Sequence, residues 1–145
     1  MIKIVNFMDK YKQQLYEIQN SVMPDNDKMT KELFLDEFNQ NFRHYFIALN
    51  DDEVVGYIGL YSYDDDYNII SIAVKSQYQN MSIGTKLLNK AKDFAKKTNK
   101  NSLSLEVDTT NIKAVNFYKK NNFVVTNIRK KYYKDNDALI MFCYL

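Results

Sequence analysis

Residues 72–88 read IAVKSQYQNMSIGTKLL, and they predict a buried strand, a polar turn and the first turns of a helix. The start of a helix carries backbone N–H groups without partners and the positive end of the helix dipole, so it can bind a phosphate group. Gly84 stands at this predicted helix start, where a ligand could approach the backbone closely. An ordinary strand-to-helix turn without a ligand fits the same stretch, which by itself leaves both interpretations open.

The apolar spacing in the rest of the chain predicts strands that alternate with helices. Strands are expected over residues 2–7, 45–49, 54–63, 68–74, 102–107, 123–128 and 139–144, with a hairpin turn at 50–52. Helices are expected over residues 11–22, 30–40, 83–95 and 112–120. Leu33, Phe34 and Phe38 should form the apolar side of the second helix, and Asn111 should be the N-cap of the fourth. No repeat or linker interrupts this order, so the sequence predicts one domain over residues 1–145, of α/β or α+β class around a mixed sheet.

Composition limits the classes of function. The chain has 145 residues, of which 46% are hydrophobic and 26% charged, as in an ordinary soluble globular protein. A net charge of +2 is too small to predict a nucleic-acid partner, and the lysines between residues 86 and 97 are expected on a solvated helix face. A single cysteine, Cys143, excludes an internal disulfide, and a single histidine, His44, predicts no structural zinc and no other metal site. We expect neither a signal peptide nor a membrane span, and therefore a cytoplasmic protein.

Two side chains near the end of the chain are candidates for acid–base chemistry. Alternation along the strand of residues 102–107 places Ser104, Glu106 and Asp108 on one face. A carboxylate inside such a strand suits a general base, but it also suits a half-exposed sheet that faces solvent. Tyr118 lies twelve residues later on an apolar helix face, where a core tyrosine with a satisfied hydroxyl is the alternative to a general acid.

The turn quoted first carries a resemblance to a known family. Val74, Gln79 and Ser82-Ile83-Gly84 resemble the acyl-CoA pyrophosphate loop of the GNAT superfamily of N-acetyltransferases. Ser82 stands where that loop usually has its first glycine, so a side chain crowds the loop while the backbone N–H is kept.

A second resemblance points to one branch of the same superfamily. Leu105-Glu106-Val107, then Asn111, Ala114 and Tyr118, then Asn121-Asn122-Phe123 is similar to the signature of ribosomal-protein-alanine N-acetyltransferases (RimI type) and their archaeal and eukaryotic relatives. Residues 129–133 (RKKYY), followed by Asp137-Ala138 and Met141, match the same branch. Asn122 occupies a usual glycine position, and asparagine tolerates positive φ better than most residues.

The resemblance implies a fold, a cofactor and a reaction. The fold would be a mixed, mostly antiparallel sheet with splayed middle strands, flanked by about four helices. Acetyl-CoA would be the co-substrate, without a metal, and Glu106 would take a proton from an attacking amine while Tyr118 protonates the departing thiolate. The implied substrate-binding residues are Met23, Pro24, Tyr132 and Tyr133. The implied cofactor-binding residues are Ile72, Ala73, Val74, Gln79, Asn80, Met81, Ser82, Ile83, Gly84, Thr85 and Asn111.

The acceptor amine is predicted from its pKa. An α-amine has an ordinary pKa of about 7.7–8 against about 10.4 for lysine, so a neutral lysine costs roughly 3.5 kcal/mol more at pH 7. A single carboxylate base therefore favours a protein N-terminus, and RimI-type enzymes imply a small-subunit ribosomal protein. A small-molecule amine such as a polyamine, an amino sugar or an amino acid is the alternative enzyme substrate. A non-catalytic acyl-CoA-binding domain is the alternative from another class, and the sequence leaves the oligomeric state open.

Overall fold

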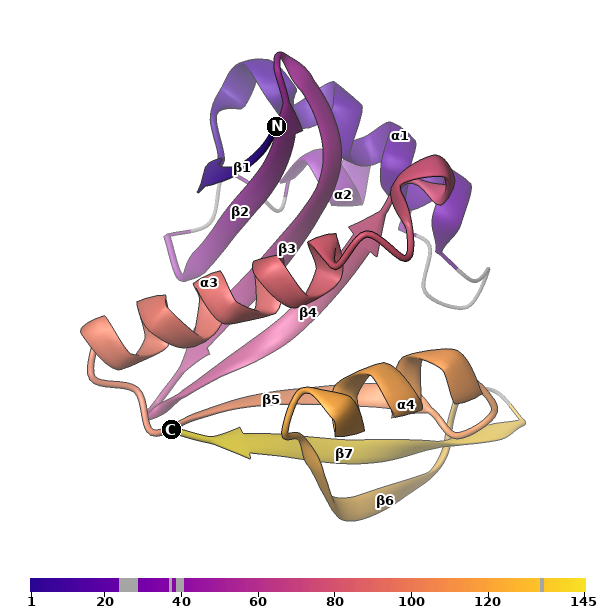
Figure 1. Ribbon diagram of the computed structural model, residues 1–145. Helices are drawn as coiled ribbons and strands as arrows, with labels where there is room; N and C mark the ends of the chain where they lie inside the picture. The colour runs from indigo at the N-terminus through magenta and orange to yellow at the C-terminus, as the bar shows by residue number, and fades with distance from the viewer. Residues whose placement is uncertain (24–28, 37, 39–40, 134) are drawn as a thin grey trace.

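The computed structural model describes residues 1–23, 29–36, 38, 41–133 and 135–145. Seven strands form one sheet in the order β1-β2-β3-β4-β5-β7-β6 (Figure 1). Every neighbouring pair is antiparallel except β4 and β5. The strands are β1 (Ile2–Asn6), β2 (Arg43–Asn50), β3 (Glu53–Tyr63), β4 (Asp66–Val74), β5 (Ser102–Asp108), β6 (Val124–Tyr133) and β7 (Asn136–Tyr144). The predicted mixed, mostly antiparallel sheet is therefore confirmed.

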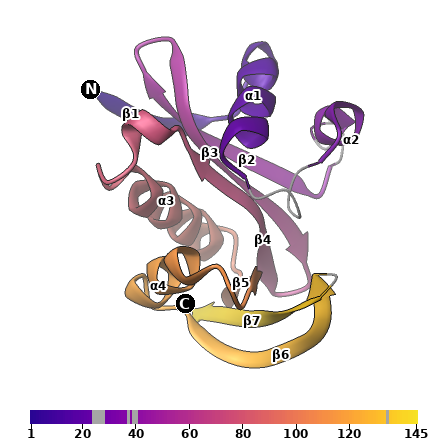
Figure 2. The same ribbon diagram turned by 90° about the vertical axis from the view of Figure 1, so that its right-hand side faces the viewer.

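Helices cover both faces of the sheet, as Figures 1 and 2 show. The helices are α1 (Lys12–Val22), α2 (Lys31–Asp36), α3 (Ile83–Lys97) and α4 (Ile112–Lys120). On one face, α3 and α4 share a buried apolar cluster with β2 to β5 and β7, whereas α1 and α2 share a second cluster with β2 and β3 on the other face. Because both faces are covered, residues 45–49 of β2 are buried without alternation.

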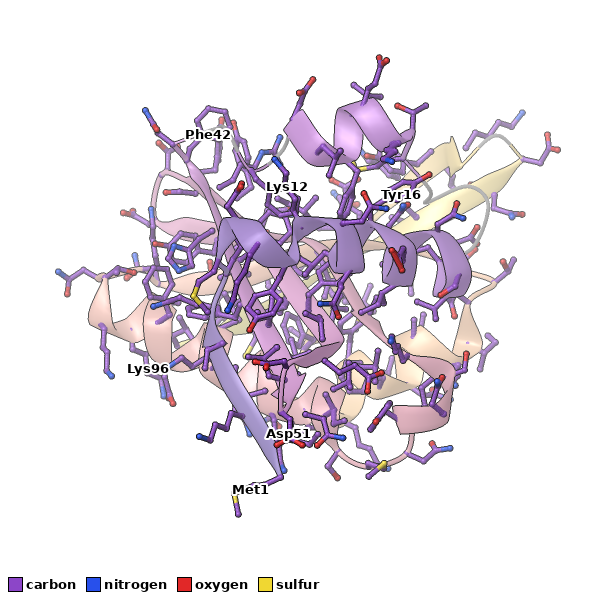
Figure 3. All side chains as sticks on the ribbon, turned by 90° about the horizontal axis from the view of Figure 1, so that it is seen from above. Met1, Lys12, Tyr16, Phe42, Asp51 and Lys96 are labelled. Atoms are coloured by element: carbon purple, nitrogen blue, oxygen red, sulfur yellow. The ribbon has the colours of Figure 1, made fainter. Side chains whose placement is uncertain are left out.

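The first helix lies across the sheet when the molecule is viewed from above (Figure 3). Lys12 and Tyr16 lie along α1, and the Tyr16 ring lies 5.9 Å from the Phe34 ring of α2. Met1 lies beside the β2–β3 turn at Asp51, as the pairing of Ile2 with Asn50 requires. No helix of the described ranges is long and apolar enough to cross a membrane.

Most predicted elements are present with small changes of boundary. The helix expected over residues 30–40 is described as α2 over Lys31–Asp36, and residues 37, 39 and 40 of the expected range lie outside the described residues. Leu33, expected on its apolar side, is 59% exposed, so that prediction is wrong. With one turn and a half, α2 has a narrow buried side, and Phe34 alone of its residues is buried. The last strand pair is confirmed, but β6 begins at Val124 and runs five residues beyond the predicted end, to Tyr133.

The two middle strands separate after a short paired stretch. β4 and β5 pair over Asp66–Asn68 and Ser102–Ser104, and no pairing between them continues beyond those residues in the described chain. The register between β3 and β4 shifts between Gly59 and Leu60, which leaves Ile70 as an extra residue in β4. A bulge of this kind bends its strand and increases the local twist. The bend carries the rest of β4 away from β5, and the two strands diverge toward the right of Figure 1.

A polar cluster closes the narrow end of this wedge. The carboxylate of Asp66 accepts hydrogen bonds from the hydroxyls of Ser102 and Ser104. Asn68 Nδ2 donates to Ser104 Oγ at 3.2 Å. Because these bonds join β4 to β5 through side chains, they hold the strands together where the backbone pairing ends. The splayed arrangement that the resemblance implied is thus confirmed.

Candidate active site

The loop that follows β4 forms one wall of a cavity of about 460 Å³, here called the loop cavity. The loop begins with a 3-10 turn over Ser76–Tyr78 and reaches the start of α3 at Ile83. Asn80 and Ser82 both adopt left-handed backbone conformations, with φ of 64° and 62°. This conformation is unusual for a residue with a side chain, and Ser82 makes no side-chain cap to α3. Residues 83–85 line the cavity, so the positive end of a 15-residue helix borders it.

Gly84 allows a close contact between two helices that the sequence analysis did not expect. A Cβ at Gly84 would lie 3.0 Å from Cζ and 3.3 Å from Cε1 of Phe117, which belongs to α4. The glycine therefore allows α4 to pack against the start of α3. Both Gly84 and Phe117 line the loop cavity, so this close packing forms part of its wall.

A second cavity of about 520 Å³, here called the strand cavity, occupies the wedge between β4 and β5. Its walls include residues 68–72 of β4 and residues 105–107 of β5. Ser71 belongs to this wall, and its hydroxyl is 2.8 Å from that of the buried Tyr57, whose pKa is raised by burial although the hydrogen bond with Ser71 opposes the change. The residues that line both cavities are Met23, Ile72, Asn111, Ala114 and Tyr118. The two cavities are therefore parts of one cleft that runs past Tyr118.

Glu106 lines the strand cavity from β5 and forms an ion pair across two strands. Arg129 of β6 reaches over β7, and its Nη1 lies 2.9 Å from Glu106 Oε2. The Arg129 side chain is 52% exposed and the Glu106 side chain 28% exposed. The same guanidinium lies 4.8 Å from the ring centroid of Tyr132, another residue that lines the cavity. The carboxylate is thus held at the edge of the cleft by a neighbour that the sequence analysis did not pair with it.

The turn between β5 and α4 fixes the position of Tyr118. Asn111 is the N-cap of α4, because its side chain accepts a hydrogen bond of 3.2 Å from the backbone N–H of Ala114, as predicted. Partial burial raises the pKa of Asp108, but hydrogen bonds from the N–H and hydroxyl of Thr110 and from Asn136 outweigh it and leave that pKa below its usual value. Seven residues after its N-cap, α4 presents Tyr118 to the cleft, with its ring against Phe117 and Phe123. At the end of α4, Asn122 has a φ of 72°, as expected at the usual glycine position.

Charge is divided between the two halves of the cleft. Among the described residues that line the loop cavity, Lys113 and Lys120 are charged and none is acidic. Among those that line the strand cavity, Glu106 is charged and none is a lysine or arginine. A cationic half beside a helix N-terminus suits a polyanion, and a half with a carboxylate suits an amine.

The structure brings together most of the residues that the resemblance singled out. Glu106, Tyr118, Met23 and Tyr132 line the cleft. Met81 is 53% exposed and lines neither cavity. Pro24 lies outside the described residues. Tyr133 is the last residue of β6, where it pairs with Asn136, and only its backbone is described. The candidate cofactor residues that line the loop cavity are Ile72, Ala73, Val74, Gln79, Asn80, Ser82, Ile83, Gly84, Thr85 and Asn111.

Sequence reasoning missed several residues that line the cleft. Lys113 and Lys120 are seven residues apart on α4 and therefore share a helix face, which the sequence could have shown. Ser71 and Phe117 gave no such signal, because their place depends on the strand bulge and on the packing of α4 against α3.

A sheet with splayed middle strands and a cleft with a cationic and an acidic half suits a transferase that binds a phosphorylated carrier. The chain belongs to the acetyltransferase (GNAT) family, whose model matches residues 12–123. As a member of this family it is an acetyl-CoA-dependent N-acetyltransferase, so the alternative of a non-catalytic domain falls away.

Relatives and solved structures agree with this assignment. A Bacillus subtilis protein provisionally named a ribosomal protein bS18-alanine N-acetyltransferase is 38% identical over 88% of this chain and 85% of its own. An N-alpha-acetyltransferase of Saccharolobus solfataricus is 31% identical over 88% of this chain and 84% of its own. The crystal structure of Ard1 from Thermoplasma volcanium has a TM-score of 0.87 at 28% identity and covers 99% of this chain and 97% of its own. The RimI-type resemblance seen in the sequence is therefore confirmed.

Proposed function

We propose that this enzyme acetylates the α-amine of protein N-termini, with Glu106 as the general base and Tyr118 as the general acid. The observation that carries the proposal is that these two side chains, from β5 and from α4, line the same cavity. The names of the relatives from Bacillus and Saccharolobus support the acceptor class, since both describe transfer to protein α-amines. A small-subunit ribosomal protein is the proposed natural substrate, by analogy with the Bacillus relative.

The division of charge in the cleft supports one direction of binding for the co-substrate. The loop cavity, with its lysines and the start of α3, would hold the phosphates of acetyl-CoA, and residues 72–74 of β4 would hold the pantetheine arm through their backbone groups. Acetyl-CoA supplies the acetyl thioester at the junction near Tyr118. The acceptor amine would enter the strand cavity, whose walls include Met23 and Tyr132.

Each of the two proton transfers is then carried out by one residue of this chain. Glu106 accepts the proton that the amine loses as its nitrogen bonds to the acetyl carbon. Tyr118 donates its phenolic proton to the sulfur as the carbon–sulfur bond breaks, so the charges balance. Arg129 holds the Glu106 carboxylate at the edge of the strand cavity, which fixes its position relative to the incoming amine. Because an α-amine is neutral in a larger fraction at pH 7 than a lysine is, one carboxylate suffices for it.

Turnover assays with three variants test the catalytic roles. We expect Glu106→Gln and Tyr118→Phe each to lower kcat about 100-fold, the lower end of what general acid–base catalysis contributes, while the KM for acetyl-CoA changes little. Tyr63→Phe is the matched control, because Tyr63 ends β3 and lines neither part of the cleft. Full activity in both site variants would refute these roles.

A panel of acceptors tests the substrate class. The panel contains peptides with a free N-terminus, the same peptides with a blocked N-terminus and a free lysine, and the polyamine, amino-sugar and amino-acid alternatives. Acetylation confined to free N-termini supports the proposal. Turnover of the small amines alone would overturn it. Mass spectrometry of cellular N-termini with and without the enzyme would then name the natural substrate.

A further inference from the structure

We infer that Lys113 binds a phosphate group of the CoA nucleotide and that its contact with Gln79 is the position it occupies before the nucleotide arrives. This inference deepens the proposed function and rests on the cofactor orientation given there. Its starting point is a bridge across the loop cavity. Lys113 Nζ, on the first turn of α4, donates a hydrogen bond of 3.0 Å to Gln79 Oε1, in the loop before α3.

Gln79 is held firmly on its own side of the cavity. Its Nε2 donates to the backbone carbonyl of Val74 at 3.0 Å, at the end of β4. The amide oxygen of Gln79 therefore faces away from β4 and toward α4, where Lys113 meets it. The two hydrogen bonds run from Val74 at the end of β4 through Gln79 to Lys113 on α4. They therefore connect the two sides of the splayed sheet.

A neutral amide oxygen is a weak partner for an ammonium group. A charged acceptor makes a hydrogen bond roughly twice as strong. The surroundings of Lys113 favour an anion further: the described lining of the loop cavity contains no carboxylate, Lys120 contributes a second cation, and α3 directs its N-terminus there. The Lys113 side chain is exposed, so it can leave Gln79 without breaking the core. A phosphate that enters this cavity is thus a better partner than the one Lys113 has.

CoA offers two sources of this chemistry, its diphosphate and its 3′-phosphate. Titrations with CoA and with 3′-dephospho-CoA, both without any acceptor amine, distinguish them. Because no acceptor is present, the result does not depend on whether the proposed peptide substrate is right. The variants are Lys113→Gln, Lys113→Arg and, as a matched control on the same helix, Lys119→Gln, because Lys119 is exposed and lines neither cavity.

We expect Lys113→Gln to raise the Kd for CoA about fivefold, the effect of one exposed ion pair worth up to about 1 kcal/mol. Lys119→Gln should leave that Kd unchanged, and Lys113→Arg should restore most of the affinity. Loss of the effect with 3′-dephospho-CoA assigns Lys113 to the 3′-phosphate, whereas an equal effect with both ligands assigns it to the diphosphate. The affinity of Lys113→Gln should also depend less on salt than that of the wild type, because one ion pair is missing. Equal Kd values for wild type and Lys113→Gln, or a loss of affinity with an unchanged salt dependence, would overturn the inference.

Discussion

The N-cap of α4 offers a test that separates folding from cofactor binding at a single residue. Asn111 has two roles in this structure: its side-chain oxygen caps α4 through the N–H of Ala114, and the residue lines both parts of the cleft. The resemblance to other N-acetyltransferases also implies that Asn111 contacts the cofactor. Asn111→Ala removes both roles, whereas Asn111→Asp keeps an oxygen for the cap and removes the N–H donor.

The expected change in the free energy of unfolding and the expected change in the Kd for CoA are each estimated from the loss of one hydrogen bond. Loss of an N-cap side chain costs about 1 kcal/mol, so Asn111→Ala should lower the free energy of unfolding by about 1 kcal/mol and the Tm by about 4 °C. Asn111→Asp should stay within about 0.5 kcal/mol of the wild type, since aspartate caps as well as asparagine and its charge suits a helix N-terminus. Loss of one neutral hydrogen bond to the ligand, worth about 1 kcal/mol, should raise the Kd for CoA about fivefold in Asn111→Ala. Asn111→Asp should raise it further, because its carboxylate adds a negative charge to a cavity that would hold the phosphates.

Urea unfolding gives the stability of each variant, and a titration with CoA gives its affinity. The two variants should therefore show opposite orders: Asn111→Ala is the less stable of the two, and Asn111→Asp binds CoA more weakly. If Asn111→Asp is as unstable as Asn111→Ala, the cap does not stabilise α4 as described. If Asn111→Asp binds CoA as tightly as the wild type, the amide N–H of Asn111 makes no contact with the cofactor.

Two further predictions concern the sheet that carries the site. Gly59→Ala should destabilise the protein by about 3 kcal/mol in urea unfolding, because the new Cβ would lie 2.7 Å from Cζ of Tyr45, whose ring is itself packed against Phe38 at 4.7 Å; a change below about 0.5 kcal/mol would contradict this. Burial lowers the pKa of His44, whose ring stacks on Phe94 of α3 at 4.2 Å. The imidazole is therefore protonated at a higher pH in the unfolded chain than in the folded protein, and the free energy of unfolding should fall as the pH drops below about 6.5. The variant His44→Phe should lose this part of the pH dependence between about pH 7 and pH 5, and identical pH profiles for the two proteins would rule the explanation out.

The sequence by itself determined the order of the elements and the local features that depend on near neighbours. The hairpin at residues 50–52, the apolar stripe of α3 and the N-cap at Asn111 all follow from residues within a few positions of one another. The exposure of Leu33 on α2 did not follow, because an exposed leucine gives the same apolar signal in the sequence as a buried one. That one domain spans residues 1–145 stays a prediction from length and composition.

Tertiary structure alone decided what the candidate residues face. From its strand position Glu106 suited a solvent-facing sheet as well as an active site, and the bulge at Ile70, which opens the wedge between β4 and β5, puts it on the wall of a cavity. Its pairing with Arg129 joins residues that are 23 positions apart, and the bridge from Lys113 to Gln79 spans 34. Such contacts depend on how distant strands and helices pack, and no local spacing in the chain encodes that packing. Short motifs in the chain therefore indicate its family, while the fold decides which side chains line the loop cavity and which line the strand cavity.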